Sequence, residues 1–296
     1  MTLMDVRQKV SDAFFCILTD ISPELNTRVR YHHYYKKKLN LNNPATFNEK
    51  LLWLKLNRYA NDPLVKICAD KYAVRQYITD CGYSDILVPL LGAYDSPLEI
   101  DFDQLPDQFA LKWNFGCGYN IICKDKKELD VRKTIRQLET WGKIKYYRFN
   151  AEMQYKDVKH KIICEEFLPG DNESGVIPDY KVYCFNGKPE VIFVMHDRGH
   201  GVKSEFFDTG WNPLENSNKY TKPTTPTPKP ICLEYLLEVS KKLSQPFPFV
   251  RCDFYILNEK VYFGEMTFTP AGGLYTSQTM VHGKDMAELL NLSVGE

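Results

Sequence analysis

Apolar positions recur at helical spacing through the first part of the chain. Phe47, Leu51 and Leu54 share one face of a predicted helix. A second helix is predicted from Pro63 to Asp80, just before a glycine. Residues 1–82 are therefore expected to form a helical N-terminal region.

From residue 105 onward, strand patterns and helix patterns alternate. The predicted strands are Phe109–Trp113, Ile121–Lys124, Lys161–Phe167, Lys181–Phe185 and Pro189–Met195, and the predicted helices are Lys126–Trp141 and Ile231–Leu243. The dipeptide Asn186-Gly187 joins two of these strands and is typical of a tight hairpin. The pattern predicts an α+β fold, with one lobe over residues 83–168 and another over residues 169–296.

A second predicted hairpin is the most informative feature of the chain. Its strands, Val250–Tyr255 and Tyr262–Thr267, are rich in aromatic and β-branched residues. If residues 258–260 form the loop, Asp253 lies directly opposite Glu265. A two-residue loop would shift the register by one and turn Glu265 to the apolar face. We expect the first register.

Facing carboxylates repel each other unless a cation lies between them. Magnesium, which is bound by one or two carboxylates together with phosphate oxygens, fits Asp253 and Glu265. The same register places Arg251 opposite Thr267. The plain alternative is a solvent-facing hairpin whose acids pair with Arg251 and nearby lysines.

Composition limits the classes of function. The chain has 296 residues, and 38 Lys and Arg balance 38 Asp and Glu, so no overall field favours nucleic acid as a partner. No apolar run is long enough to cross a bilayer, and the start lacks the features of a signal peptide. The nine cysteines form no Cys-x-x-Cys pair, which favours small buried thiols in a reducing compartment. We expect a cytoplasmic protein, whose basic run 36–38 allows peripheral contact with a membrane or a lipid-linked sugar.

A glycine loop follows the strand that carries Lys112. Gly116 and Gly118 let backbone amides approach phosphate oxygens, and Lys112 supplies charge, as expected of a flap over a triphosphate. The loop lacks the Gly-Lys-Ser/Thr of a Walker motif and the third glycine of a dinucleotide fingerprint. A plain glycine hairpin is the alternative.

Three further groups of residues become candidates for the same site because of their order along the chain. Lys71 follows Asp70 within the predicted helix 63–80, where a solvated charge is the plain alternative. A strand ending at Pro169-Gly170 can offer backbone groups and one acid to an adenine, although a strand that simply ends in a charged turn is the favoured alternative from these residues alone. Asp179 and Lys181 share one side of the next strand. The residues of these two groups are Glu165, Glu166, Phe167, Leu168, Asp179 and Lys181.

This order resembles the ATP-grasp fold, in which two α+β lobes hold ATP between them. In D-alanine:D-alanine ligases of that fold, two lysines, an adenine-strand acid, an Arg-x-Asp and a Glu-x-Asn occur in the same order. A closer resemblance, to the teichuronopeptide-synthesis group of ATP-grasp amidoligases, covers almost the whole chain. It is carried by Asn43-Pro44-Ala45-Thr46-Phe47-Asn48-Glu49-Lys50, Asp70-Lys71-Tyr72-Ala73-Val74-Arg75, Gly118-Tyr119-Asn120-Ile121-Ile122 and Phe263-Gly264-Glu265.

The resemblance implies an ATP-dependent ligase that forms an amide through an acyl phosphate. Its implied cofactors are ATP and Mg²⁺, and its implied partners are a carboxylate-bearing sugar or polysaccharide precursor and an amine or amino acid, in bacterial surface polysaccharide biosynthesis. The implied metal ligands are Asp253, Glu265 and Thr267, the implied catalytic residues are Arg251 and Lys112, and the implied nucleotide contacts are Lys71, Lys112, Gly116, Gly118, Glu165 or Glu166, Phe167, Leu168, Asp179 and Lys181.

The chain also departs from its group. Thr267 stands where the wider superfamily has Asn, and the glycine loop has Phe115 and Cys117 where the group tends to carry His and Ser.

Three other functions stay open: a kinase using the same site, a metal-dependent glycosyltransferase using Asp101 and Asp103, and a non-catalytic nucleotide-binding module. A zinc site at residues 196–200 is disfavoured, because its histidines follow a strand and are separated by a glycine.

Overall fold

The computed structural model describes residues 3–170, 177–196, 201–215, 220–275 and 280–293. The helices of this part are α1 (Leu3–Ile21), α2 (Pro23–Tyr35), α3 (Phe47–Leu54), α4 (Pro63–Ala69), α5 (Val74–Asp80), α6 (Val131–Gly142), α7 (Tyr147–Asn150), α8 (Leu233–Ser244) and α9 (Met286–Leu289). The strands are β1 (Leu90–Tyr94), β2 (Phe109–Trp113), β3 (Asn120–Cys123), β4 (Ile162–Glu166), β5 (Asp179–Phe185), β6 (Lys188–His196), β7 (Lys203–Phe207), β8 (Phe249–Leu257), β9 (Lys260–Thr267), β10 (Met280–Val281) and β11 (Lys284–Asp285).

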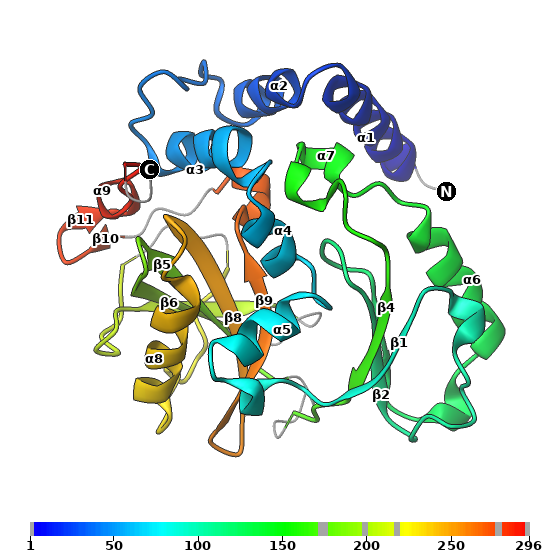
Figure 1. Cartoon of the computed structure of the whole chain (residues 1–296). Helices are drawn as coiled ribbons and strands as arrows, with labels where there is room; N and C mark the ends of the chain where they lie inside the picture. Colours follow the sequence, from blue (N-terminus) through cyan, green and yellow to red (C-terminus); the bar gives the residue numbers. More distant parts are fainter. Residues whose placement is uncertain (1–2, 171–176, 197–200, 216–219, 276–279, 294–296) are drawn as a thin grey trace.

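Two antiparallel sheets form the centres of two lobes (Figure 1). The smaller lobe has a four-stranded sheet in the order β1-β4-β2-β3, and α6 packs beside it. The larger lobe has a five-stranded sheet in the order β7-β6-β5-β8-β9. The α+β class predicted from the sequence is confirmed. Strands β1 and β7 were not predicted; both lie at sheet edges and are only five residues long.

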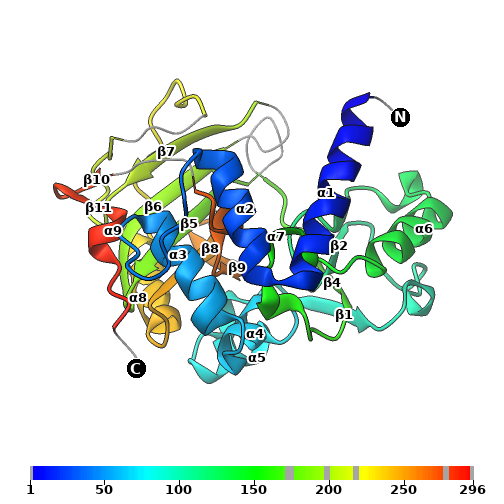
Figure 2. The ribbon, with the colours of Figure 1, turned by 90° about the horizontal axis from the view of Figure 1, so that it is seen from above.

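The helices leave one face of the larger sheet turned toward the smaller lobe. α8 covers the opposite face, where its Ser240 carbonyl accepts a bond from Cys184 at 3.8 Å, and α5 lies beside α8 through Tyr77. Apolar residues of α3, α4, α5 and α8 share one core with β5, β6 and β8. The helices of the N-terminal region therefore help to build the larger lobe. Figure 2, which is seen from above, shows α2 on the side of the larger lobe and α1 on the side of the smaller lobe.

Two predicted helices begin or end differently in the structure. The predicted helix 126–141 is a short 3₁₀ turn, Lys126–Glu128, followed by α6, because Asp130 caps a new helix by accepting from the Lys133 amide at 2.9 Å. The predicted helix 63–80 is interrupted between Ala69 and Val74. This second difference shapes the site.

Candidate active site

A break between α4 and α5 places Lys71 in the cleft. Asp70 ends α4 with an extended backbone, and its carboxylate accepts hydrogen bonds from the amides of Tyr72 and Ala73 at 2.7 and 3.1 Å. Such local bonds compete with helix formation, which explains why the continuous helix predicted from periodicity was wrong. The Lys71 amide donates to the Asn114 carbonyl at 2.9 Å, so the break is attached to the end of β2.

Asn114 fixes this junction from the small lobe. Its side chain is fully buried, donates to Asp70 Oδ2 at 2.8 Å and to the Lys159 carbonyl at 3.0 Å, and accepts from the Lys161 amide at 2.9 Å. Burial raises the pKa of Asp70, although its amide donors oppose that shift. No sequence pattern singled out Asn114, because its partners lie on three separate segments.

The glycine loop joins β2 to β3 and is tied to Lys71. Gly116 and Gly118 have φ of 61° and 85°, a region that favours glycine, and a Cβ on Gly116 would lie 2.6 Å from the ring of Tyr146. The Lys71 ammonium donates to the Gly116 carbonyl. Phe115 is buried against Trp113, Tyr119 and His160, so it anchors the base of the loop within the small-lobe core.

The two acids at the end of β4 have different surroundings. Glu165 is buried and pairs with Lys112 at 2.6 Å and with Arg75 at 3.1 Å. Glu166 is exposed and lines a cavity together with Phe167 and Leu168. Of the alternatives left open by the sequence, Glu166 is therefore the acid on the cavity side, and Glu165 holds Lys112 in place.

The acidic hairpin has the predicted register around its carboxylates but a different turn. Asp253 pairs with Glu265 and Arg251 pairs with Thr267 across β8 and β9. The turn, however, has two residues, because Asn258 and Glu259 adopt φ of 49° and 62° and Leu257 pairs with Lys260.

An irregularity next to Asp253 restores the register. Phe254 pairs with Phe263, so Gly264 is an extra residue in β9 and forms a β-bulge. A Cβ at Gly264 would lie 3.0 Å from the Asp253 carbonyl oxygen, which explains the glycine. The predicted three-residue loop was wrong, and the bulge returns Glu265 to the face of Asp253.

Three basic side chains surround the two carboxylates. Asp253 accepts from Arg251 Nε and Nη2 at 2.6 and 2.7 Å and from Lys181 Nζ at 2.6 Å. Glu265 lies 3.2 Å from Lys71 Nζ and 3.9 Å from Arg251 Nη2. Side chains from α4–α5, β5, β8 and β9 therefore converge on one charged cluster. Lys181 also approaches Asp179 at 3.6 Å.

The charges change the ionisation of the cluster. Burial opposes ionisation of Glu265, but the charges of Lys71, Arg251 and Lys181 outweigh it and lower its pKa to about 2. Burial also disfavours the Arg251 cation, yet Asp253 and Glu265 raise the pKa of Arg251 above its usual value. Glu265 and Arg251 therefore stabilise each other's charged forms.

The donor set suits magnesium bound together with phosphates. Asp253 and Glu265 offer carboxylate oxygens from opposing strands, and the Thr267 hydroxyl lies 3.4 Å from Glu265 Oε1 and 3.1 Å from Arg251 Nη2. Within the described residues, no cluster of three or more His, Cys, Asp or Glu could hold a metal by itself. Two carboxylates that need substrate oxygens to complete the coordination are typical of Mg²⁺ rather than of a structural metal.

Three connected cavities run along the cleft between the sheets. The first, of about 350 Å³, has mostly apolar walls that include Val88, Ala110, Ile122, Phe167, Leu168 and Ile177. The second, of about 120 Å³, is lined by the glycine loop and by Lys71, Lys112, Asp179, Lys181, Asp253 and Glu265. The third, of about 490 Å³, has tyrosine-rich walls. Asp179 and Lys112 line both the first and the second cavity, and Lys181 and Glu265 line both the second and the third.

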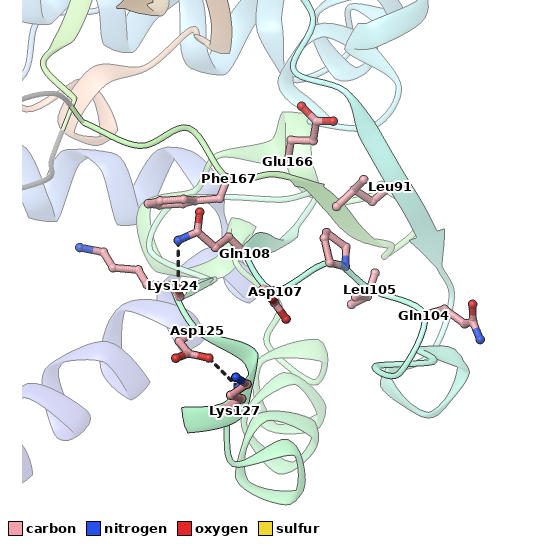
Figure 3. Close-up of a pocket in the computed structure, with 11 residues that line it drawn as sticks. Leu91, Gln104, Leu105, Asp107, Gln108, Lys124, Asp125, Lys127, Glu166 and Phe167 are labelled. Atoms are coloured by element: carbon pink, nitrogen blue, oxygen red, sulfur yellow. Dashed lines mark hydrogen bonds between the residues drawn. The ribbon is translucent and has the colours of Figure 1, made fainter.

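A larger hollow of about 910 Å³ lies outside this row. Figure 3 shows Glu166 and Phe167 at its border with Gln108 and Lys124, whose carbonyl accepts from Gln108 at 3.0 Å. None of the residues of the charged cluster lines this hollow. It adjoins the apolar end of the cleft only.

The other candidates from the sequence lie away from the cluster. Asp101 and Asp103 are exposed residues of one turn, and neither lines any of the four cavities above. His196 contacts the Thr227 hydroxyl at 2.8 Å, while residues 197–200 lie outside the described residues. Lys36 ends α2 in a left-handed conformation, and the basic run is exposed.

Two lobes with antiparallel sheets, an apolar pocket and a charged cluster between them define the ATP-grasp class of nucleotide-binding folds. The chain belongs to the TupA-like ATPgrasp family, whose model matches residues 49–285. No curated protein matches the sequence. Within the described residues, every helix is too short or too polar to cross a membrane.

Solved structures with similar chains are distant. D-alanine–D-alanine ligase from Bacillus anthracis complexed with ATP is 17% identical over 69% of this chain and 57% of that chain, with a TM-score of 0.43. L-amino acid ligase from Bacillus licheniformis is 13% identical over 75% and 49%, with a TM-score of 0.44. N5-carboxyaminoimidazole synthetase from Staphylococcus aureus complexed with ADP is 16% identical over 75% and 50%, with a TM-score of 0.40. The matched parts amount to 49–57% of these longer proteins.

Proposed function

We propose that the protein is an ATP-dependent carboxylate–amine ligase that forms an amide through an acyl phosphate. The observation that carries this proposal is the row of three cavities, with the charged cluster shared between the second and the third. The adenine, the triphosphate and the acceptor substrate would then lie in that order along one cleft. Membership of the TupA-like ATPgrasp family supports the same assignment.

The side chains of the cluster suit phosphoryl transfer, in which positioning and charge do most of the catalysis. Lys71 and Lys112 would hold phosphate oxygens from opposite lobes, and Glu165 would keep Lys112 oriented. Asp179, which lines both of the first two cavities, would contact the ribose. Arg251, which lines the third cavity, would face the transferring group and the tetrahedral intermediate.

Magnesium is the metal that the proposal requires, with Asp253, Glu265 and Thr267 as its ligands. When bound there, Mg²⁺ would neutralise phosphate charge as it develops. Lys71, Lys181 and Arg251, which pair with these carboxylates, would supply positive charge to the phosphate oxygens beside the metal.

The substrate class follows from the resemblance of the sequence. We propose a uronic acid, or a similar carboxylate in a surface polysaccharide precursor, joined to an amino acid or small amine. The aromatic third cavity, with Tyr183, Phe193 and Tyr275 among its walls, supports a ring-shaped substrate. A cytoplasmic location belongs to the same proposal, since all nine cysteines carry free thiols.

The test has two parts. Thermal shift with ATP, ADP and UDP-glucose, each with and without MgCl₂, should show stabilisation by the adenine nucleotides and further stabilisation of ATP complexes by MgCl₂. ADP release is then measured with glucuronate or galacturonate, with and without amino acids. The ligase requires both substrates; release without any amine would indicate a kinase, and stabilisation by UDP-glucose but not ATP would indicate a glycosyltransferase.

A further inference from the structure

A buried acid in the wall of the third cavity does not belong to the charged cluster. Glu152 is 4% exposed and lines the cavity together with Arg251, Glu265 and Thr269. It follows Ala151, which ends α7 with a φ of 53° and turns the chain. Glu152 therefore faces the same space as the proposed transferring group.

Lys55 joins the segment that carries Glu152 to the segment that contains Gly272. The ammonium of Lys55, which is 1% exposed, donates to the Asn150 carbonyl at 2.8 Å and to the Gly272 carbonyl at 3.4 Å. Gly272 has a φ of 66°, and a Cβ there would lie 2.9 Å from the Asn150 side chain. The backbone around Glu152 is thus fixed by contacts that leave its carboxylate for other partners.

Those partners carry no charge, although the carboxylate is buried. Glu152 accepts from the Thr269 hydroxyl at 2.5 Å and from the Asn150 amide at 3.4 Å. Among the described residues, no ion pair involves Glu152, whereas Glu165 and Asp253 each pair with two bases. A buried acid that lacks a direct cation and borders a cavity is a candidate functional group.

The surroundings make Glu152 a stronger proton acceptor than an exposed carboxylate. Burial raises the pKa of Glu152, while the hydrogen bond from Thr269 and the charges of Lys55 and Arg30 oppose the shift. Two further titratable groups face it: Tyr146 and Tyr155, whose own pKa values are raised by burial and by the charge of Glu152. Glu49, which is also buried, shows the contrast, because its amide donors outweigh burial and lower its pKa.

We propose that Glu152 is the general base that accepts a proton from the ammonium group of the amine substrate in the third cavity. The proposal rests on the ligase function. One ammonium proton passes to a Glu152 oxygen, and the free amine attacks the acyl carbon. The new C–N bond gives a tetrahedral intermediate, and the C–O bond to phosphate then breaks. The second proton leaves with inorganic phosphate, and Glu152 returns its proton to solvent.

The test compares two amines in the wild type and in Glu152→Gln. Glycine and L-lysine are protonated at neutral pH and need a base, whereas hydroxylamine is mostly uncharged and does not. With ATP, MgCl₂ and glucuronate or galacturonate, Glu152→Gln should lower the rate with glycine or lysine by about 100-fold and leave hydroxamate formation within about threefold. The remaining rate with glycine or lysine should then rise with pH as the free amine does.

Two further variants separate chemistry from folding. Glu152→Asp should recover part of the rate with glycine or lysine. Glu49→Gln removes another buried carboxylate, one that does not line the cavity, so it should lower stability without changing the ratio of the two rates. Equal loss with both amines in Glu152→Gln, or no loss with either, would overturn the role of Glu152 alone. No ADP release by the wild type with any of these substrates would overturn the ligase function and the role of Glu152 together.

Discussion

Replacement of Glu265 by Gln tests the charged cluster in the absence of any ligand. The side chain lies 3.2 Å from Lys71 Nζ and 3.9 Å from Arg251 Nη2. Its pKa falls from 4.5 to about 2, which at about 1.36 kcal/mol per unit corresponds to about 3.4 kcal/mol of stabilisation. Because 30% of the Glu265 side chain is exposed, solvent screening reduces this figure, and we expect a loss of about 1–2 kcal/mol.

The assay is urea denaturation at neutral pH and at lower pH. Glu265 has a lower pKa in the folded chain than in the unfolded chain. Its contribution should therefore be complete above about pH 4.5 and should decrease as the pH falls toward 2. The difference between the wild type and Glu265→Gln should shrink over the same range and at high salt.

Glu259→Gln provides the matched control, since Glu259 lies in the exposed turn of the same hairpin. This control should change the free energy of unfolding by less than about 0.5 kcal/mol. If Glu265→Gln were as stable as the wild type at neutral pH, or more stable, the proposed balance of charges in the cluster would be wrong.

Three other substitutions probe the supports of the cluster. Asn114→Ala removes the side-chain donor to Asp70 Oδ2 and the acceptor of the Lys161 amide, so urea denaturation should show a loss of about 2–4 kcal/mol, and an unchanged midpoint would contradict that. Gly116→Ala places a Cβ 2.6 Å from a tyrosine ring at a φ of 61°, so calorimetry should show at least about tenfold weaker ATP binding; wild-type affinity would mean that the loop does not contact the nucleotide. Glu165→Gln releases Lys112 from its 2.6 Å ion pair and should raise the Kd for ATP about tenfold, whereas an unchanged Kd would make that pair purely structural.

The sequence predicts best where local patterning and chemistry agree. Alternation around Asp253 and Glu265 gave the correct pairing of the carboxylates, and Asn186-Gly187 gave the correct turn between β5 and β6. The order of the motifs indicated the ATP-grasp fold, which the family match confirms. These features depend on residues close together in the chain or on motifs spread over most of it.

The remaining features depend on contacts between distant segments. The break at Asp70 is fixed by Asn114, 44 residues away, and periodicity alone continued the helix through it. The bulge at Gly264 compensates for the short turn, and nothing in the alternation distinguishes this combination from a longer loop. No sequence pattern pointed to Glu152 as a functional residue, because Lys55 and Thr269, which interact with it, belong to segments far away in the sequence.

The most direct test of the account is the effect of magnesium on ATP binding. Calorimetry would measure the Kd of a non-hydrolysable ATP analogue with MgCl₂ and with EDTA, for the wild type and for Asp253→Asn, which removes one proposed metal ligand. We predict that MgCl₂ tightens binding at least about tenfold in the wild type and less than about twofold in Asp253→Asn. An equal effect of MgCl₂ on both proteins, or no binding of the analogue to the wild type, would contradict a nucleotide held between Lys71, Lys112 and the acidic hairpin.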